Sequence, residues 1–268
     1  MKRIVLLAAV VGLGLTQGAR AADMSVHGLS PSPFFLPPVN SMPDWSGLYI
    51  GFNGGYGFGS SSVSANFFGP IVTAGEPLGF STAGNPAGAV FGGQVGYNWQ
   101  WASLVFGVEG DFDAATLTAS GNAVTNSIAG AGAPVGFQAS SSINWLSSVR
   151  ARLGYTWGPG LVYLTGGGAW VNTDIKTLTC DTAFAACTQG NFTGTQSGWT
   201  LGAGFEWMIA PNWIARTEYL YYSLGSRTNA SAFTTPVAAL AGSGVSVTAN
   251  TLNINVIRAG LEYKFDWH

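Results

Sequence analysis

Apolar side chains recur at every second position in eight separate segments of this chain, and this pattern restricts the fold more than any other feature. In the first segment, Leu48, Ile50 and Phe52 alternate with Gly51 and Asn53. A period of two places successive side chains on opposite faces of a β-strand, so each segment is predicted to be a strand with one apolar face. The segments cover about residues 48–58, 91–100, 104–113, 148–155, 161–175, 199–207, 213–221 and 253–265.

Two of these segments depart from simple alternation. The glycine run at 166–168 blurs the phase of the fifth segment, and the sequence leaves its faces unassigned. In the eighth segment the apolar positions are even at Ile254 and Val256 but odd from Ile257 to Leu261. One extra residue in a strand produces such a change of face, so we predict a β-bulge near Val256.

The composition indicates that the apolar strand faces contact lipid. Charged residues make up 8% of the chain, against about 25% in soluble domains. Outside the first residues, no apolar stretch approaches the roughly 18 residues of a transmembrane helix. A closed barrel is the other structure that pairs every backbone amide within hydrocarbon. The sequence therefore predicts an all-β fold, an eight-stranded antiparallel up-and-down transmembrane β-barrel over residues 45–265.

The connections between the predicted strands alternate in length. Short turns are expected at 101–103, 157–160 and 210–212. Four long external loops are expected at about 59–87, 120–138, 176–195 and 224–247. Such barrels place short turns in the periplasm and long loops outside, so both chain ends are expected on the periplasmic side. An aromatic girdle at the inner interface is predicted from Trp99, Trp101, Trp157, Trp207 and Trp213.

The chain begins with the layout of a secretory signal peptide. Lys2 and Arg3 precede an apolar run over residues 4–15, and Ala19 and Ala21 supply the small-x-small pattern. The apolar run is too short to span a bilayer. Residues 1–21 are therefore predicted to be removed by cleavage after Ala21.

The segments that flank the predicted barrel carry few signals. Residues 22–44 contain five prolines and no periodicity, which predicts an extended periplasmic lead, and residues 266–268 form a short C-terminal extension. Removing Lys2, Arg3 and Arg20 with the signal peptide leaves seven basic and 12 acidic residues. This negative balance argues against a nucleic-acid partner.

Most charges within the strands fall on the face opposite the apolar one and should point into the barrel lumen. An eight-stranded barrel is just wide enough for side chains to fill it. An unpaired buried charge costs several kcal/mol, so these residues are expected to form ion pairs. The alternative is a charged constriction that guides ions. The predicted lumen charges are Glu109, Asp111, Asp113, Arg150, Arg152, Glu206, Arg216, Glu218, Arg258, Glu262 and Lys264.

No catalytic or metal site is predicted. Glu109, Asp111 and Asp113 could hold a cation, but Arg150 and Arg152 on the next strand are expected to neutralise them. The two histidines, His27 and His268, lie outside the barrel, so a base for hydrolysis is missing. We expect no enzyme activity and no cofactor.

The only two cysteines lie close together in the third predicted loop. Cys180 and Cys187 would be exported to an oxidising compartment, where a local disulfide is expected. A metal site is disfavoured because no histidine lies nearby.

Six strand motifs resemble the opacity-type outer membrane β-barrel family, and especially the outer membrane immunogenic proteins of alphaproteobacteria. The motifs are D-W-S-G-L-Y-I-G-F-N-G-G-Y-G from Asp44, G-G-Q-V-G-Y-N-W-Q from Gly92, S-V-R-A-R-L-G-Y from Ser148, S-G-W-T-L-G-A-G-F-E-W from Ser197, P-N-W-I-A-R-T-E-Y-L-Y-Y-S-L-G from Pro211 and V-I-R-A-G-L-E-Y-K-F from Val256. Members of this family usually end at an aromatic residue, whereas here three residues follow Phe265. The resemblance implies a surface antigen and structural envelope protein without catalytic residues, and some members are described as porins or haem binders.

We therefore expect a monomeric structural protein of the Gram-negative outer membrane. Its expected partners are outer membrane lipid, lipopolysaccharide, and the export and barrel-insertion machinery. One alternative is a narrow porin, because inward glycines such as Gly96 and Gly204 would leave volume unfilled. Another is an adhesin or a binder of a haem-like ligand, which would use loop aromatics such as Phe67, Phe68 and Phe233.

Overall fold

The computed structural model describes residues 43–69, 79–126, 134–181, 186–232 and 244–265. The predicted signal peptide with Ala19 and Ala21, nearly all of the Pro-rich lead, and residues 266–268 lie outside these ranges. Within the described ranges, no helix has the length and hydropathy to cross a membrane.

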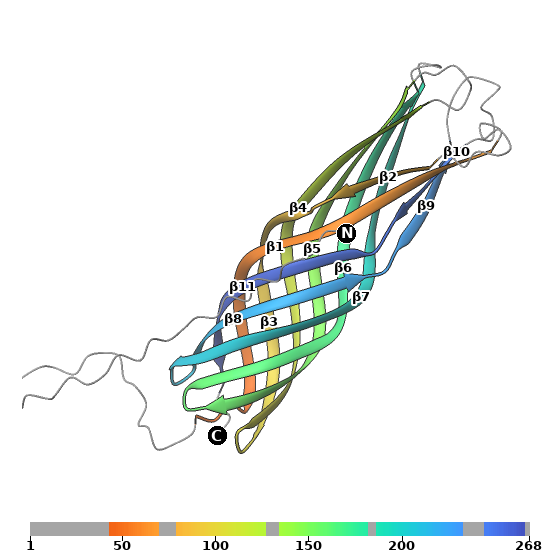
Figure 1. Ribbon diagram of the computed structural model, residues 1–268. Helices are drawn as coiled ribbons and strands as arrows, with labels where there is room; N and C mark the ends of the chain where they lie inside the picture. Colours follow the sequence, from red (N-terminus) through yellow and green to blue (C-terminus); the bar gives the residue numbers. More distant parts are fainter. Residues whose placement is uncertain (1–42, 70–78, 127–133, 182–185, 233–243, 266–268) are drawn as a thin grey trace, which may run out of the picture. The chain divides into compact units, whose positions relative to one another are not determined.

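All regular structure in the described part of the chain is β-strand (Figure 1). The strands are β1 (Gly47–Phe68), β2 (Gly79–Gly84), β3 (Ala87–Trp101), β4 (Leu104–Asn126), β5 (Pro134–Trp157), β6 (Gly160–Asp181), β7 (Ala186–Ala210), β8 (Trp213–Leu224), β9 (Arg227–Ala232), β10 (Gly244–Ala249) and β11 (Leu252–Lys264).

Eight of these strands form a closed ring of antiparallel neighbours. The order is β1, β3, β4, β5, β6, β7, β8 and β11, and β11 pairs back with β1 from Tyr49 opposite Lys264 to Ser60 opposite Asn253. Each ring strand therefore pairs with the ring strands before and after it in the chain, and the last one, β11, pairs with the first one, β1. The ring confirms the predicted eight-stranded antiparallel up-and-down barrel.

Short turns connect the strands at one end of the ring. They lie at the three predicted places, and two residues separate β3 from β4, β5 from β6, and β7 from β8. Ala102 in the turn between β3 and β4 and Gly158 in the turn between β5 and β6 each have a φ value of 53°. Glycine adopts this left-handed backbone without steric cost, whereas alanine rarely does.

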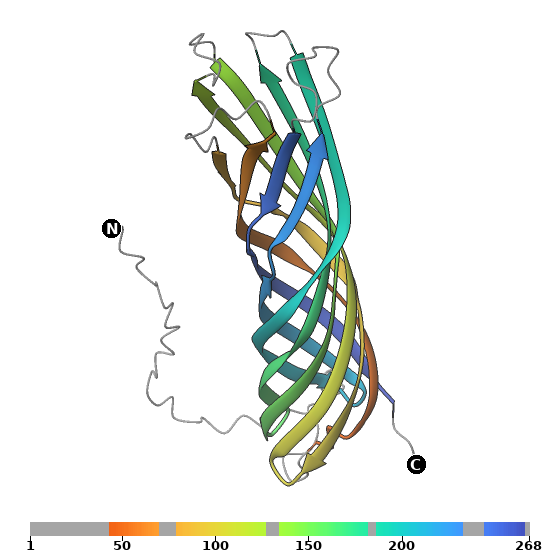
Figure 2. The ribbon, with the colours of Figure 1, turned by 90° about the vertical axis from the view of Figure 1, so that its right-hand side faces the viewer.

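The other end of the barrel divides into two sheets of four strands each, and Figure 2 shows this end. There β1 leaves β3 and β11 and pairs with β2 and β10, and β10 pairs with β9. The upper parts of β4, β5, β6 and β7 continue as the second sheet. No hydrogen-bonded ladder joins β2 to β4 or β9 to β7 among the described strands. We call the sheets the β1 sheet and the β5 sheet, and this region the upper barrel.

The predicted long loops are wrong over much of their length. Strands occupy 59–68 and 79–84 of the first, 120–126 and 134–138 of the second, 176–181 and 186–195 of the third, and 227–232 and 244–247 of the fourth. Glycine, serine and threonine are abundant there, which resembles loop composition. Their backbones are nevertheless held by ladders to neighbouring strands.

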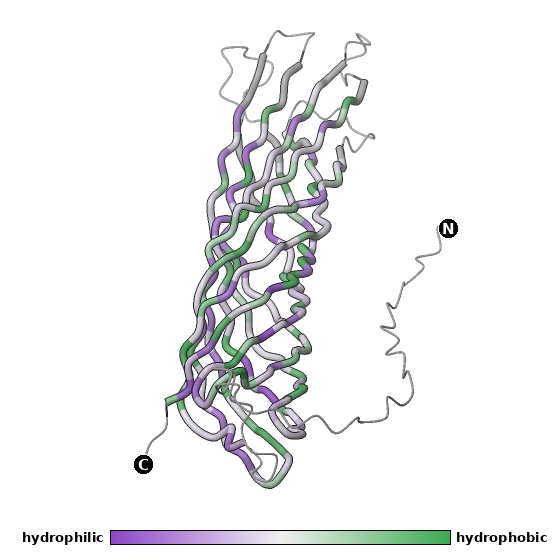
Figure 3. The backbone as a smooth tube through the Cα atoms, turned by 90° about the vertical axis from the view of Figure 1, so that its left-hand side faces the viewer, coloured by the Kyte–Doolittle hydropathy of each residue, from purple (hydrophilic) through white to green (hydrophobic). Residues whose placement is uncertain are grey.

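The outer surface of the lower barrel, between the short turns and the split, is apolar. Phe52 and Leu164 on β1 and β6 are 65% and 67% exposed. Figure 3 shows hydrophobic and hydrophilic positions interspersed along the strands of the barrel. All five predicted girdle tryptophans are exposed beside the short turns, and Trp213 lies 5.3 Å from the Tyr263 ring centroid to centroid. The five are Trp99, Trp101, Trp157, Trp207 and Trp213.

A second aromatic belt, which the sequence analysis did not predict, lies near the split. Trp170 and Trp199 are exposed there, Trp145 stacks on Phe112 at 5.5 Å, and Trp199 lies 5.6 Å from Tyr221. Beyond this belt the outward positions become polar, with Asn144 donating to Asp174 at 2.8 Å. Two belts with an apolar band between them are typical of a membrane-spanning barrel.

The bulge predicted near Val256 is wrong. The register of β11 runs without a shift from Asn253 to Tyr263 against β8, and to Lys264 against β1. Ile254 and Val256 point inward like Arg258, and both are fully buried. The pleat is therefore constant, and the interior itself changes from charged to apolar along the strand.

Register shifts occur elsewhere in the ring. One lies between Ala114 and Leu117 of β4, opposite Ile143 and Trp145 of β5, and another lies between Met208 and Ala210 of β7.

Candidate functional site: the barrel interior

The structure places all eleven predicted lumen charges inside the barrel, where each is buried. They are Glu109, Asp111, Asp113, Arg150, Arg152, Glu206, Arg216, Glu218, Arg258, Glu262 and Lys264. Alternation positions them, because the opposite face of each strand carries the apolar residues. Ten of them, the four arginines and the six acids, form one network, which we call the charge layer. Lys264 donates from Nζ to the Asp44 carbonyl oxygen at 2.8 Å.

Glu109 of β4 is the centre of the charge layer. Arg150 on the neighbouring strand β5 donates to its Oε1, and Arg216 of β8 donates to its Oε2 at 2.6 Å. Strands β4 and β8 lie on opposite sides of the ring. This pairing therefore crosses the whole lumen.

Arg258 of β11 closes the upper side of the charge layer. Its Nη1 lies 2.6 Å from Asp113 Oδ2, and its Nη2 lies 2.6 Å from Glu218 Oε2 and 3.0 Å from Asp111 Oδ2. Asp111 also accepts from Arg150 at 2.7 Å. The acids of β4 are thus paired both with the adjacent strand, as expected, and across the lumen.

Two buried tyrosines complete the charge layer, and the sequence analysis missed both. Tyr49 donates to Glu109 at 2.6 Å and accepts from Arg152 at 3.0 Å. The Tyr163 ring lies 4.0 Å from the Arg152 guanidinium carbon, and its hydroxyl donates to Glu218 at 2.9 Å. Tyr49 alternates with lipid-facing residues of β1, so the alternation pattern could have identified it as an inward side chain. Tyr163 lies in the segment whose phase was left unassigned.

The charge layer contains six carboxyl groups and four guanidinium groups. One oxygen of each of Asp113, Glu206 and Glu262 has no hydrogen-bond partner in the described part of the chain. Arginine side chains separate the acids, and no group of three or more His, Cys, Asp or Glu among the described residues is arranged to hold a metal ion. The geometry is that of an ion-pair network.

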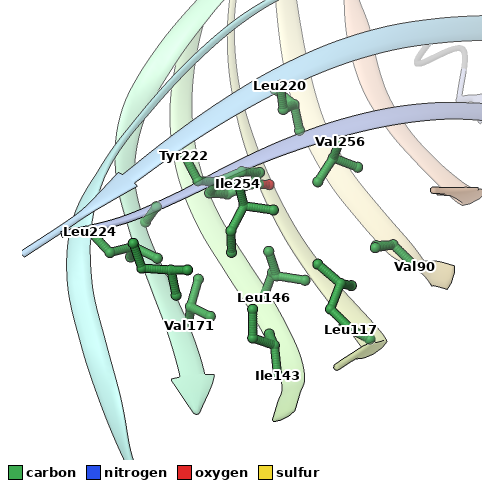
Figure 4. Packing of buried hydrophobic residues seen from close by; sticks show 13 residues of the cluster. Val90, Leu117, Ile143, Leu146, Val171, Leu220, Tyr222, Leu224, Ile254 and Val256 are labelled. Carbon is green, nitrogen blue, oxygen red and sulfur yellow. The ribbon is translucent and has the colours of Figure 1, made fainter. Parts of the chain in front are cut away.

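Further along the strands from the charge layer, toward the split, the inward side chains are apolar, and Figure 4 shows how they pack. Leu117, Leu146, Leu220 and Ile254 are fully buried there and come from strands around the ring. The whole cluster is Val90, Ala115, Leu117, Ile143, Leu146, Ala169, Val171, Leu220, Tyr222, Leu224, Leu252, Ile254 and Val256. We call it the upper apolar layer.

A smaller apolar cluster closes the barrel beside the short turns. Trp45, which precedes β1, is fully buried against Val105, Leu161, Met208 and Ile214. The Trp45 amide donates to the Gln100 side chain at 2.7 Å, which fixes the entering chain. The charge layer is therefore enclosed between two apolar clusters.

The inward glycines do not leave open volume. A Cβ added at Gly96 would collide with the Tyr49 ring, and one at Gly204 would collide with Tyr163. These glycines are needed because large aromatic side chains lie directly on their backbone. The expectation that Gly96 and Gly204 leave volume for a narrow pore is therefore wrong.

Four further predicted residues belong to strands of the upper barrel. The register places Cys180 of β6 opposite Cys187 of β7, at strand ends rather than within a loop. Their disulfide stays a prediction. Phe67 and Phe68 end β1, while Phe233 lies outside the described residues.

Strands that face lipid outside and bury a paired charge layer inside define a transmembrane β-barrel of the outer membrane type. Residues 38–265 match the family of the outer membrane protein β-barrel domain, and the chain belongs to this family. It is an outer membrane protein.

Named relatives agree with this assignment. The chain is 35% identical over 263 residues to the 31 kDa outer-membrane immunogenic protein of Brucella melitensis, covering 97% of this chain and 99% of that protein. It is 30% identical to the 25 kDa outer-membrane immunogenic protein of Brucella abortus, covering 99% of each. A 22 kDa outer membrane protein of Rhizobium leguminosarum is 29% identical over 71% of this chain and 69% of its own length. The predicted resemblance to the outer membrane immunogenic proteins is confirmed.

Solved structures with a similar fold are more distant. The outer membrane protein OprG from Pseudomonas aeruginosa is 12% identical with a TM-score of 0.46, covering 85% of this chain and all of that one. The outer membrane protease OmpT from Escherichia coli is 10% identical with a TM-score of 0.39, covering 80% of this chain and 97% of that one. Likenesses at this level say nothing about activity.

Proposed function

We propose that this protein is a closed structural barrel of the outer membrane, which contributes to envelope integrity and presents its upper barrel as a surface antigen. The observation that carries the proposal is the sealed interior. The ion-paired side chains of the charge layer are at most 2% exposed, and an apolar cluster lies on each side of them.

The proposed orientation places the short turns in the periplasm and the upper barrel outside. It rests on the rule that such barrels have short turns in the periplasm, and it puts both described chain ends there, because the Phe265 amide donates to the Leu48 carbonyl oxygen beside the short turns. The polar outer surface beyond the second aromatic belt, including Asn144 and Asp174, suits water and lipopolysaccharide sugars. Lipid, lipopolysaccharide and the export and insertion machinery are the proposed partners of a monomer that binds no nucleic acid.

We further propose that the protein is not an enzyme. The two histidines of the chain are at positions 27 and 268, and neither belongs to a strand that carries the charge layer. The buried carboxyl groups are held by arginines at ion-pair distance. A general base for hydrolysis must reach its substrate, and these groups are enclosed.

The test is single-channel conductance of the refolded protein in a planar bilayer. We expect no steady open steps from the natural sequence. Three variants test which layer blocks the lumen. Arg150→Ala with Arg216→Ala loosens the charge layer, and Leu117→Ala with Leu220→Ala loosens the upper apolar layer. The fourfold variant loosens both layers. Because the two layers lie in series, the fourfold variant is expected to leak most.

The matched control removes a charge that lies outside the charge layer. Arg227→Ala in β9 should leave the bilayer silent. Steady open steps from the natural sequence would overturn the structural proposal and make the protein a narrow porin.

A further inference from the structure

The two seams between the sheets of the upper barrel differ in packing. At the β2–β4 seam, a Cβ on Gly84 would lie 3.1 Å from the Ala119 Cβ, and one on Gly121 would lie 3.2 Å from the Ala83 carbonyl oxygen. Glycines thus let these two strands approach closely. At the β7–β9 seam, pairing of β7 with β8 ends where Gly198 meets Leu224, and a pocket opens above that point.

Arg227 at the start of β9 crosses the open seam. Its Nη1 lies 3.5 Å from the Thr195 carbonyl oxygen of β7. A Cβ added at Gly194 would collide with the guanidinium, so the side chain lies directly over the backbone of β7. The hydrogen bond between Thr228 and Thr248 occupies the other face of β9. Arg227 has no ion-pair partner among the residues that the structure describes.

The seam pocket has a volume of about 190 Å³ and combines an apolar wall with polar groups. Ile175, Phe192 and Val247 supply the apolar wall, and Arg227 and Gln196 supply the polar groups. Gln196 is 6% exposed, and its Oε1 has no hydrogen-bond partner within the described residues. A buried acceptor without a donor marks a position that a bound group can satisfy.

A second, smaller cavity shares part of its lining with the seam pocket. It has a volume of about 20 Å³ and is lined by Gln196 and Ala249, which also line the seam pocket, and by Ile143 and Leu252. Ile143 and Leu252 belong to the upper apolar layer. A cavity of this size holds about one water molecule, so it is too small to admit a ligand from the seam pocket.

We propose that the seam pocket binds a small hydroxylated aromatic carboxylate. The carboxylate would pair with Arg227, whose planar fork suits a carboxylate. The ring would pack against Ile175, Phe192 and Val247, and the hydroxyl would donate to Gln196 Oε1. A cavity of about 150 Å³ holds one benzene molecule, so the volume of this pocket fits a single substituted ring. This site does not require the lumen to conduct.

The experiment titrates 4-hydroxybenzoate into the refolded full-length protein in detergent and follows binding by saturation-transfer NMR. Saturable binding is expected. Benzoate, which lacks the hydroxyl, should bind several-fold more weakly, and 4-hydroxybenzyl alcohol, which lacks the carboxylate, should show no saturable binding. Absence of saturable 4-hydroxybenzoate binding overturns the proposal.

Two variants test the role of Arg227, and one serves as a matched control. Arg227→Gln removes the positive charge. Gly194→Val keeps the charge but displaces the Arg227 guanidinium from its position. Each should weaken binding at least tenfold. Lys176→Gln removes one positive charge from the outward face of β6, outside the pocket, and should leave binding unchanged.

Heat-dependent gel mobility establishes that each variant is folded. Full affinity in Arg227→Gln, or an equal loss in Lys176→Gln, overturns the site. A conducting lumen would contradict the structural function without affecting these results.

Discussion

The lower and upper parts of the barrel use the same strands with opposite polarity. In the lower part of β6, Val162 and Leu164 face outward and are exposed, while charged side chains of the neighbouring strands are buried in the lumen. In the upper part of β6, Asn172 and Asp174 lie outward near Asn144, while Val171 is buried inside. The pleat never changes phase on this strand. In the proposed orientation, the medium outside the strand changes from lipid to water.

This exchange of apolar and polar faces shows that the alternation of residues along a β-strand depends on the surroundings of both faces. A strand in lipid needs an apolar outer face and can bury paired charges inside, because the lumen offers partners. A strand in water needs a polar outer face, and its inner face supplies the hydrophobic burial. The transition occurs where the upper apolar layer replaces the charge layer.

Breaking the charge layer should have the largest effect. Arg216→Ala removes the group that joins Glu109, Glu218 and Glu262, with nitrogen to oxygen distances of 2.6 to 2.7 Å. Three buried carboxylates would lose their shared partner. Removing one member of a buried ion pair costs about 3–5 kcal/mol. The free energy of unfolding in lipid vesicles, from urea titration followed by tryptophan fluorescence, should fall by that amount.

A control variant isolates the role of burial. Arg227→Ala in the upper barrel also removes a guanidinium, but that side chain is exposed at the seam. It should change the free energy of unfolding by less than about 0.5 kcal/mol. Equal losses in the two variants would contradict the ion-pair network as a source of stability.

The second prediction tests the exchange of apolar and polar faces on β11, where the interior becomes apolar. Ile254 is fully buried in the upper apolar layer. Ile254→Ala should lower the free energy of unfolding by about 2–4 kcal/mol, because it leaves a cavity between close-packed strands. Asn255→Ala on the opposite face should cost much less. A larger loss of stability in Asn255→Ala than in Ile254→Ala would instead support the predicted bulge near Val256.

The sequence predicts the ring well because lipid imposes one simple rule. The lower strands, their two-residue turns and the girdle tryptophans follow from alternation and from where it stops. The same rule fails at Ile254 and Val256, because it assumes that an apolar position faces outward. The upper strands were missed for a related reason: their outward faces meet water, so serine and threonine there resemble loops.

The barrel interior was likewise predicted only in part. Phase alone places the charged side chains inside, since no other position in a membrane strand tolerates them. Which arginine pairs with which acid could not be predicted, because Glu109 and Arg216 meet across the ring rather than between neighbouring strands. The seam pocket was also out of reach, because it depends on where the β7–β8 ladder ends.

A third prediction compares the two outer surfaces directly. Leu164→Arg places a charge in the apolar band between the aromatic belts, where an arginine costs about 2–4 kcal/mol. Asn172→Arg, eight residues along the same strand and beyond Trp170, should cost nearly nothing. Urea titration in vesicles measures both. Equal costs would mean that the upper barrel is also embedded in lipid.

The smallest effect is expected at the tip of the β6–β7 hairpin. Cys180 lies opposite Cys187 in the register, so a disulfide there would close only the few residues between the two strand ends. Crosslinking a short loop at a strand end restrains the chain locally. Replacing both cysteines with serine should leave the global free energy of unfolding within about 0.5 kcal/mol, while cleavage by added protease at the tip becomes faster.

The bond itself is measured by mass spectrometry of the unreduced protein after alkylation. The expected result is that neither thiol is modified and that the peptide is lighter by two hydrogens than its reduced form. Alkylation of both cysteines in the folded protein would show that the hairpin tip is held by its backbone ladder alone. The upper barrel would then depend on the same hydrogen-bonded pairing as the lower one, without a covalent link at its outer end.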